Sequence, residues 1–394
     1  MKASFKQKSS PLQDEMDSAL AGRVGPLFAD ALAARSFSGA SCLVAGASSI
    51  LFEAAYGVLG FTPGAAAITT DTWFDLASLS KPLVTASLCM VAVSQGWLDL
   101  DTPLEQLLAH RYVPADKARI TLRQLLNHCS GLPAYRPFYR NLSDVALPMR
   151  RETLITWILQ ESLLSSPETL SVYSDLGFMV VADILEHHLA MALDAAATKF
   201  LFQPVGITDL GFRSALLNEF PPDPRGTGSP STPVRFAETE WCPWRRRRLS
   251  GEVHDENASA LGGVAGHAGL FGTARGMHRW LTFLWDVHEG RATGPWLTAP
   301  VVRTFWQRQE LVAGSTWALG FDTPSAADSS AGDHFSPRTV GHLGFTGTSF
   351  WLDLEQEIMI ILLTNRVHQG RNGIAIKAFR PQLHNAIMET LYAR

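Results

Sequence analysis

The first regular pattern in the chain extends from Pro11 to Arg35. Its apolar residues recur about every 3.6 positions, the period of a helix that buries one face; they are Leu12, Met16, Leu20, Val24, Leu27 and Leu32. Two short β-rich runs follow, over Ala40–Ala45 and Ser49–Tyr56, with a plausible tight turn at Ala47-Ser48 between them. The pattern therefore predicts an N-terminal helix followed by a β-hairpin.

The next change of pattern lies at Thr72–Leu76, a short β-type run that leads directly into a strongly apolar segment. We predict a short strand and then a buried helix that reaches Gln95 and is stopped by Gly96. Pro82 is tolerated in the first turn, because the N–H groups there have no intrahelical partner. Residues 99 to about 205 are helix-rich, and the stretch 221–234, rich in Pro, Gly, Ser and Thr, predicts a surface loop.

The C-terminal part returns to strands. We predict one strand over Thr316–Phe321, a hairpin of Gly344–Leu354 and Glu357–Thr364, and a last helix over roughly Ile374–Tyr392. The order helix, strands, helical middle, strands, helix favours an α/β (α+β) fold, in which one antiparallel sheet is built from both chain ends. We predict a single domain over residues 1–394, with an α/β lobe at 11–80 and 290–394 and an inserted helical lobe at 81–289.

Composition and charge narrow the class of protein. Of the 394 residues 46% are hydrophobic, and the net charge of −4 implies no strong field for nucleic acid or an anionic membrane. No stretch reaches the roughly 18 apolar residues of a membrane span. The basic N-terminus lacks the apolar region of a signal peptide, so a cytoplasmic location is expected. The run Arg245–Arg248 is interpreted as a solvated surface, with contact to a ligand carboxylate as the alternative.

Cysteine and histidine patterns offer no metal or cofactor site. The four cysteines are scattered without a Cys-x-x-Cys pair, which argues against both a zinc site and a disulfide framework. His254-Asp255-Glu256 suggests metal ligands, but adjacent residues of a helix point apart and no His-Glu-x-x-His occurs. We expect Asp255 to cap a helix and His254 to be structural or to line a pocket. No metal and no cofactor is predicted.

The first candidate for chemistry is Ser78 with Lys81. A spacing of three places both side chains on one face of a helix, one turn apart. A serine hydroxyl becomes a good nucleophile when a neighbouring base takes its proton. A lysine can be that base if burial or nearby positive charge lowers its pKa, and Lys81 opens a strongly apolar helix. Free N–H groups at a helix N-terminus also favour developing negative charge.

A second candidate is Tyr173-Ser174-Asp175, which precedes a predicted helix from Met179 to Leu189. A tyrosine near a lysine can share its proton and act as general base or acid, and Asp175 can hydrogen-bond Lys81 or the substrate. The alternative interpretation is structural, with Ser174 or Asp175 as a helix N-cap and Tyr173 packed.

A third candidate lies at Gly341-His342-Leu343-Gly344-Phe345-Thr346-Gly347-Thr348, ahead of Ser-Phe-Trp-Leu-Asp. Its glycines permit close backbone approach at the start of a strand. Such an edge can bind an extended acyl chain by strand addition, and its first N–H groups can contribute to an oxyanion hole. The alternative is a glycine-rich strand entry with a structural histidine.

Together these elements resemble the serine β-lactamase and penicillin-binding-protein superfamily. In that superfamily Ser-x-x-Lys, Tyr-x-Asn or Ser-x-Asn, and Lys-Thr-Gly occur in this order, and the spacings here are similar to those of class C β-lactamases and their esterase and D,D-peptidase relatives. The stretch Ile120–Pro133 resembles a loop beside the pocket of these relatives. Gly251–Ala258 and Gly262–Phe271 resemble segments of a bacterial subgroup described as D-alanyl-D-alanine carboxypeptidase-like serine hydrolases.

The resemblance implies a β-lactamase/transpeptidase-like fold and an acyl-enzyme mechanism. Ser78 would be the nucleophile, Lys81 and Tyr173 would move the proton, and the N–H groups of Ser78 and Phe345 would hold the oxyanion. Asp175, His342, Gly344 and Tyr135 would contact a small-molecule or peptide substrate. Water would then deacylate the enzyme, with Tyr173 as the base.

The chain departs from the family pattern at two motifs. Asp175 stands where the family has Asn, and His342-Leu343 stand for the Lys-Thr that helps to hold a substrate carboxylate. The departures argue against an efficient β-lactamase and favour a D,D-carboxypeptidase with altered carboxylate recognition, a carboxylesterase-like enzyme or an amide hydrolase. Because a histidine titrates near neutrality, we expect His342 to make activity depend on pH. The alternative function is a module that binds penicillin or senses muropeptides without turnover.

Overall fold

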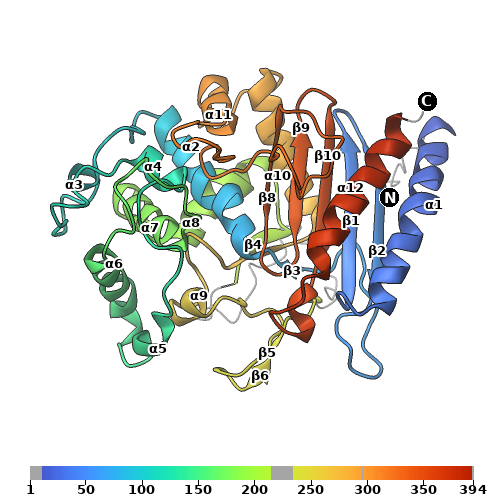
Figure 1. The fold of residues 1–394 in the computed structure, drawn as a ribbon, viewed down its shortest axis with the longest axis horizontal. Coiled ribbons are helices and arrows are strands. Elements are labelled where there is room, and N and C mark those ends of the chain that lie inside the picture. Colours follow the sequence, from blue (N-terminus) through green and yellow to red (C-terminus); the bar gives the residue numbers. More distant parts are fainter. Residues whose placement is uncertain (1–10, 214–233, 295, 393–394) are drawn as a thin grey trace, which may run out of the picture.

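The computed structural model describes residues 11–213, 234–294 and 296–392. Its main sheet is antiparallel, with the strand order β2-β1-β10-β9-β8 (Figure 1). The strands are β1 (Gly39–Gly46), β2 (Ile50–Gly57), β8 (Thr339–Leu343), β9 (Ser349–Asp353) and β10 (Ile358–Thr364). Because β1 pairs with β10, the two ends of the chain meet inside one sheet, which confirms the predicted architecture.

Two terminal helices, α1 (Pro11–Ala33) and α12 (Ala375–Tyr392), cover one face of this sheet (Figure 1). Both place apolar side chains on the alternate residues of β1 and β10 that point toward them; the buried members include Leu20, Val24, Phe28, Cys42, Val44, Ile360, Leu362, Leu383 and Ile387. The opposite face packs against α10 (Ala274–Glu289), an amphipathic helix whose N-cap is Thr273. Both faces are therefore buried, as the nearly continuous apolar run of β10 requires.

The remaining helices and strands lie beside the main sheet. Most of them come from the middle part of the sequence. The helices are α2 (Ser87–Ser94), α3 (Leu104–Leu107), α4 (Leu122–Leu126), α5 (Tyr139–Leu142), α6 (Arg150–Gln160), α7 (Asp175–Leu189), α8 (Leu193–Ala197), α9 (Glu256–Ala260) and α11 (Ala299–Trp306). A small sheet has the order β3-β7-β4 and a separate hairpin pairs β5 with β6; these strands are β3 (Phe74–Asp75), β4 (Leu210–Phe212), β5 (Trp241–Cys242), β6 (Arg247–Arg248) and β7 (Leu270–Gly272). The boundaries of the two lobes stay a prediction.

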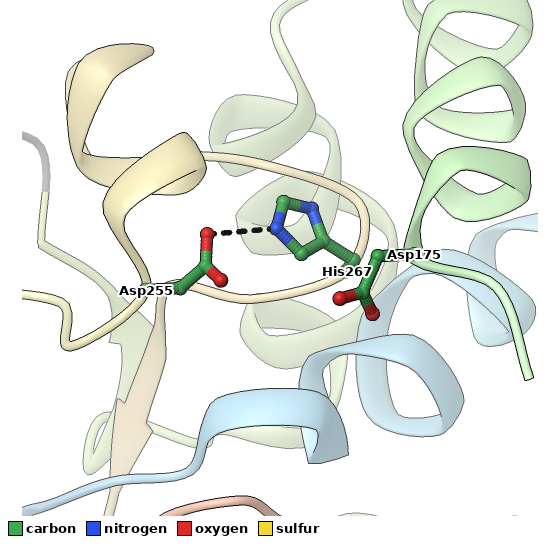
Figure 2. A group of neighbouring side chains, drawn as sticks. All are labelled: Asp175, Asp255 and His267. Carbon is green, nitrogen blue, oxygen red and sulfur yellow. Dashed lines mark hydrogen bonds and ion pairs between the residues drawn. The ribbon is translucent and has the colours of Figure 1, made fainter. Parts of the chain in front are cut away.

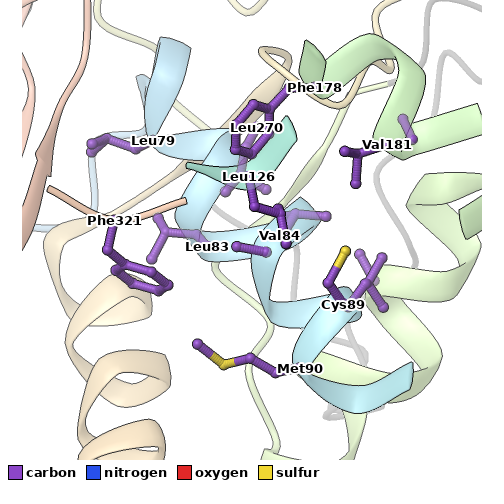
Figure 3. Close-up of a cluster of buried hydrophobic side chains, with 14 of the residues drawn as sticks. Leu79, Leu83, Val84, Cys89, Met90, Leu126, Phe178, Val181, Leu270 and Phe321 are labelled. Atoms are coloured by element: carbon purple, nitrogen blue, oxygen red, sulfur yellow. The ribbon is translucent and has the colours of Figure 1, made fainter. Parts of the chain in front are cut away.

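The apolar segment after β3 forms the centre of the larger core. It begins as a 3₁₀ turn at Ala77–Leu79, continues with wide π-helical turns at Lys81–Ala86 and becomes α-helical in α2. Leu83, Val84 and Cys89 are fully buried among side chains of α4, α7 and β7 (Figure 3). By length and composition Ala77–Ser94 is apolar enough to cross a membrane, but 83% of this segment is buried inside the protein.

One predicted strand was wrong, and a second is shorter than predicted. Thr316–Phe321 forms only an isolated bridge between Trp317 and Asp322, because the chain turns at Gly320, where φ is +78°. The predicted strand Gly344–Leu354 begins only at Ser349. Residues 344–348 are instead a tight turn, in which Gly344 N–H donates to the Thr348 carbonyl, and the strand before it, β8, was not predicted. Of the predicted loop 221–234, residues 221–233 lie outside the described residues.

The packing of α1 on the sheet generates a prediction about stability. The Phe28 side chain is fully buried, and its ring stacks on Tyr56 at 4.1 Å and meets the edge of Phe379 at 5.2 Å. We expect Phe28→Ala to lower the free energy of unfolding by about 3–5 kcal/mol, because the lost ring leaves a cavity. Urea denaturation measures this loss. Phe28→Leu, which refills most of the volume, should lose much less; equal losses in both variants would contradict the packing argument.

Candidate active site

Ser78 lies directly after a strained residue that the fold holds in place. Ala77 has φ of +49°, a conformation that non-glycine residues rarely adopt. The buried Asp75 carboxylate accepts the Ala77 N–H at 2.8 Å and the His254 N–H at 2.5 Å. Burial raises the pKa of Asp75 in spite of these two hydrogen bonds. Asp75 thus ties the segment that carries Ser78 to the residues ahead of α9.

The Lys81 ammonium group contacts three other groups of the site. Its Nζ lies 3.1 Å from Ser78 Oγ and 2.6 Å from Asp175 Oδ1, and it donates to the His267 carbonyl at 3.3 Å. The side chain of Lys81 is fully buried, whereas Ser78 is partly exposed. The predicted pairing of Ser78 with Lys81 across one turn is therefore present, although that turn is 3₁₀ and π rather than α.

The charge on Lys81 differs from the sequence-based expectation. Burial lowers the pKa of the ammonium group, but the Asp175 carboxylate and then Tyr173 raise it, and the net pKa lies above its ordinary value. The expectation that the apolar helix would leave Lys81 with a lowered pKa was wrong, because Asp175 supplies a carboxylate where the family has a neutral amide. Lys81 therefore rests as a cation in an ion pair.

Tyr173 and Asp175 reach Lys81 from the start of α7. The Ser174 hydroxyl caps this helix by accepting the Gly177 N–H, and it also donates to the Pro133 carbonyl at 2.7 Å. The Lys81 Nζ lies 4.6 Å from the centroid of the Tyr173 ring. Burial raises the pKa of the Tyr173 hydroxyl, Lys81 lowers it, and the net shift is upward. Ser174 is therefore the N-cap of α7 and Asp175 hydrogen-bonds Lys81, both as predicted, whereas proton transfer by Tyr173 stays a prediction.

The turn of residues 344–348 docks on the backbone just before Ser78. Thr346 Oγ1 donates to the Asp75 carbonyl at 2.7 Å, and Thr348 Oγ1 donates to the Leu76 carbonyl at 3.2 Å. Gly344 is required there: a Cβ atom at this position would overlap the Thr348 hydroxyl and lie 2.7 Å from the Leu76 carbonyl oxygen. Gly344 therefore permits a close approach of two backbone segments.

Two backbone donors remain unused where these segments meet. Within the described part of the chain, neither the N–H of Ser78 nor that of Phe345 donates a hydrogen bond. Phe345 follows the docked Gly344, and its side chain is 46% exposed. A pair of free N–H groups from a nucleophile and a neighbouring strand end is the arrangement of an oxyanion hole.

His342 lies at the end of the edge strand β8 and is fully buried. Burial and the nearby Lys81 ammonium lower the pKa of His342 to about 3, so the imidazole is neutral throughout the physiological range. The predicted pH switch at His342 was wrong, because the sequence does not reveal how deeply β8 buries this ring. Its Nδ1 lies 2.8 Å from the Leu343 carbonyl and donates to it, which leaves an unprotonated Nε2.

His128 is a neighbour of the site that the sequence interpretation did not single out. Its Nδ1 accepts the Ser174 N–H at 3.0 Å, and its ring packs 4.6 Å from Tyr173 and 4.5 Å from Trp317. Burial, with Lys81 and His342, holds the pKa of His128 well below its usual range. The one sequence feature that pointed to His128 was its position within the stretch Ile120–Pro133. Only the fold brings its ring against that of Tyr173.

Asp175 also belongs to a second cluster, which it forms with Asp255 and His267 (Figure 2). Their ligand-type atoms lie within 4.8 Å of one another, as in a site for a cation. However, His267 Nε2 is already bound to Asp255 Oδ1 at 2.9 Å and Asp175 to Lys81, so a metal ion would compete with the ammonium group. Burial raises the pKa of Asp255, but His267 and the Ala258 N–H lower it more, and the net shift is downward. Asp255 is also the N-cap of α9, as predicted.

Other sequence candidates form no hydrogen bond with the side chains of Ser78 or Lys81 within the described residues. Tyr135 is 38% exposed, and no hydrogen bond within the described residues joins it to Ser78 or Lys81. In the basic run, Arg245 donates to the Val253 and His254 carbonyls, and Arg247 pairs with the exposed Glu252. This run therefore supports its own loop. His254 lines the site, with its ring 5.6 Å from that of Phe345.

A partly exposed serine beside a buried lysine, where an antiparallel sheet meets a helical region, is typical of serine hydrolases related to penicillin-binding proteins. The Beta-lactamase family model matches residues 24–381, and the chain belongs to this family. A "Putative D-alanyl-D-alanine carboxypeptidase" of Salmonella gallinarum is 27% identical over 310 residues, 76% of this chain and 71% of the relative; its Salmonella typhimurium counterpart is 28% identical over the same shares.

Solved structures share the fold at low sequence identity. Simvastatin synthase (LovD) from Aspergillus terreus superposes with a TM-score of 0.69 at 16% identity, covering 95% of this chain and 99% of that one. EstCE1, described as a hydrolase with promiscuous acyltransferase activity, has a TM-score of 0.68 at 21% identity and covers 94% and 99%. An octameric penicillin-binding protein homologue from Pyrococcus abyssi has a TM-score of 0.66 at 17% identity and covers 91% and 76%.

The docked turn generates a prediction. We expect Gly344→Ala to lower the free energy of unfolding by about 1–3 kcal/mol, because the new methyl group must push the turn away from Leu76. Thermal or urea denaturation measures the loss. The matched control is Gly22→Ala in α1, where no atom lies within 4 Å of the added methyl group; it should be neutral or stabilising by up to about 1 kcal/mol. A fully stable Gly344→Ala variant would contradict the close approach.

Proposed function

We propose that this protein is a serine hydrolase that forms an acyl-enzyme on Ser78 and acts best on carboxylic esters with an uncharged acyl group. The observation that carries the proposal is the 3.1 Å contact between Ser78 Oγ and the fully buried Lys81 Nζ. A buried lysine beside a partly exposed serine is the arrangement in which a hydroxyl can lose its proton as it attacks.

In the proposed acylation, Ser78 Oγ forms a bond to the carbonyl carbon of the substrate. The reacting form of the Lys81–Tyr173 pair has first lost one proton to solvent; it takes up the Ser78 proton, and the carbonyl oxygen takes up the electron pair as an oxyanion held by the N–H groups of Ser78 and Phe345. The bond to the leaving group then breaks, and the pair returns a proton to the departing oxygen. Water attacks the acyl-enzyme in the same way with Tyr173 as its base, which releases the carboxylic acid and restores the Ser78 hydroxyl.

The preference for uncharged esters follows from the residues at positions 342 and 343, where relatives of this family have lysine and threonine. His342 is neutral, since its pKa is lowered to about 3, and Leu343 is apolar. Neither residue can replace the lysine and threonine that hold a substrate carboxylate in relatives of this family. The similarity to EstCE1, which is described as a hydrolase, supports hydrolysis in general but not a particular acyl group. We expect β-lactam hydrolysis to be weak at most.

A second candidate is a D,D-carboxypeptidase acting on peptides that end in D-Ala-D-Ala. The names of the Salmonella relatives, at 27–28% identity over 76% of this chain, favour it. This activity would need a cation other than the residue at position 342 to hold the terminal carboxylate of the peptide.

The nucleophile is tested with a fluorophosphonate probe and intact-mass analysis. We expect one adduct on the native chain and none on Ser78→Ala. The matched control is Ser80→Ala, two residues away, whose hydroxyl donates to the Ala77 carbonyl and accepts the Leu270 N–H; this variant should still be labelled. An adduct that persists in Ser78→Ala would overturn the assignment of the nucleophile.

Substrate class is tested with p-nitrophenyl esters, a D-Ala-D-Ala peptide and a chromogenic cephalosporin. We expect steady turnover of the short-chain esters, little turnover of the peptide, and the least of the cephalosporin. Faster turnover of the peptide than of every ester would favour the second candidate. A lasting adduct without turnover of any substrate would instead indicate a binding or sensing module.

The ion pair of Lys81 predicts how activity depends on pH. The Asp175 charge stabilises the Lys81 ammonium and opposes a Tyr173 tyrosinate, so it raises the pKa of both groups. Because the reaction needs one proton fewer on this pair, kcat/KM should rise with pH. Asp175→Asn removes the charge and lowers both pKa values, so the rising limb should move down by about 1 pH unit or more.

The control for this shift is Asp101→Asn, which removes the same charge from an exposed ion pair with Arg123. Its pH profile should match that of the native enzyme. A profile of Asp175→Asn that stays in place, or that moves to higher pH, would refute the role of Asp175 in raising the pKa of the Lys81–Tyr173 pair.

A further inference from the structure

Arg380, on α12, is a buried cation that the proposed mechanism does not use. It is 6% exposed, although the buried residues of α12 are mostly apolar. No carboxylate pairs with it within the described residues. Burying a charge that has no oppositely charged partner lowers the stability of a fold. We therefore expect the buried Arg380 guanidinium group to lower the free energy of unfolding.

The contacts of Arg380 all go to the docked turn. One guanidinium nitrogen donates to the Gly344 carbonyl at 3.1 Å and to the Thr348 carbonyl at 2.7 Å. The Gly344 carbonyl also accepts the Gly347 N–H at 3.0 Å. Gly344 C=O and Phe345 N–H belong to the same peptide unit. The Arg380 cation therefore binds the carbonyl oxygen of the peptide whose N–H group donates no hydrogen bond.

The surroundings of Arg380 leave its charge unscreened. Burial and the neighbouring Arg366 lower its pKa to about 9, which still leaves it protonated near neutral pH. Burial lowers the pKa of both His342 and His384 to about 3, and the Arg380 charge adds to each shift, so these neighbours are neutral. Arg366 donates to the Phe345 carbonyl at 2.7 Å and thereby fixes the next peptide as well.

We infer that Arg380 is a positioning residue for the oxyanion hole: it polarises the Gly344–Phe345 peptide and so strengthens the Phe345 N–H as a donor to the developing oxyanion. A hydrogen bond to the oxygen of a peptide draws electron density from its N–H, and a charged donor in a medium of low dielectric does so most strongly. The inference rests on the proposed function, because it takes Phe345 N–H as the oxyanion donor.

The test compares Arg380→Met, which keeps the bulk of the side chain without its charge, with Arg380→Lys, which keeps the charge. We expect Arg380→Met to slow fluorophosphonate labelling of Ser78 and ester kcat by about 10- to 100-fold, less than the loss of a whole oxyanion donor. Its affinity for a boronic acid, which forms a tetrahedral anion on Ser78, should fall by a similar factor, whereas KM for the ester stays nearly constant. Arg380→Lys should recover part of each loss.

A purely structural role is separated by a control on the same helix. His384→Gln changes a fully buried side chain one turn further along α12, whose Nδ1 contacts the Ser330 carbonyl and not the turn. It should lower the melting temperature without slowing the labelling of Ser78. If Arg380→Met fails to fold, Arg380→Lys still decides the matter, since its labelling rate should lie below that of the native chain and its boronic acid affinity should fall in parallel.

Three results would overturn the inference: native labelling rates in Arg380→Met, equal slowing in His384→Gln, or no change of boronic acid affinity where labelling slows. Failure of the proposed function is distinguishable from these results, because it would appear as the absence of a Ser78 adduct in the native chain itself.

Discussion

The burial of the Lys81 ammonium group is the constraint on which the rest of the site depends. A cation without any exposed surface is stable only with a partner, and removing one member of a buried pair typically costs about 3–5 kcal/mol. Asp175 is that partner, at 2.6 Å, and the His267 carbonyl is a further acceptor. These contacts join three parts of the chain: the apolar segment that starts near Ser78, the N-terminus of α7, and the loop after α9.

The turn of residues 344–348 is the second constraint, since it brings the sheet to the nucleophile. Two threonine hydroxyls bind the carbonyls of Asp75 and Leu76, and Gly344 leaves room for this approach. Arg380 holds the same turn from the opposite side. The sheet, built from both chain ends, therefore presents a backbone edge rather than a charged side chain to the substrate.

The membership of the Beta-lactamase family and the departures from its motifs concern different parts of the site. The family model covers residues 24–381, and the Ser78–Lys81–Tyr173 group has the residue types common in that family. Asp175 and His342 differ, and both act through charge: one adds a carboxylate beside Lys81, and the other replaces a cation with a neutral ring. Family membership thus indicates a serine hydrolase, while the roles of these two residues in pH dependence and substrate choice belong to the proposed function.

The sequence by itself determined the order of the elements and the chemical types at the centre of the site. Helical and strand periods predicted α1, the β1–β2 hairpin, β10 and α12, because apolar spacing is a local property of the chain. It also indicated Ser78, Lys81, Tyr173 and Asp175, because each lies in a short motif and the order of these motifs along the chain resembles that of a known superfamily. Only the tertiary structure decided that β8 precedes the 344–348 turn, that Lys81 keeps its proton and that His342 is neutral. These properties depend on burial and on charges from distant segments, for which no local pattern exists. The same holds for Arg380. No sequence pattern shows that this residue of the C-terminal helix contacts the 344–348 turn beside Ser78.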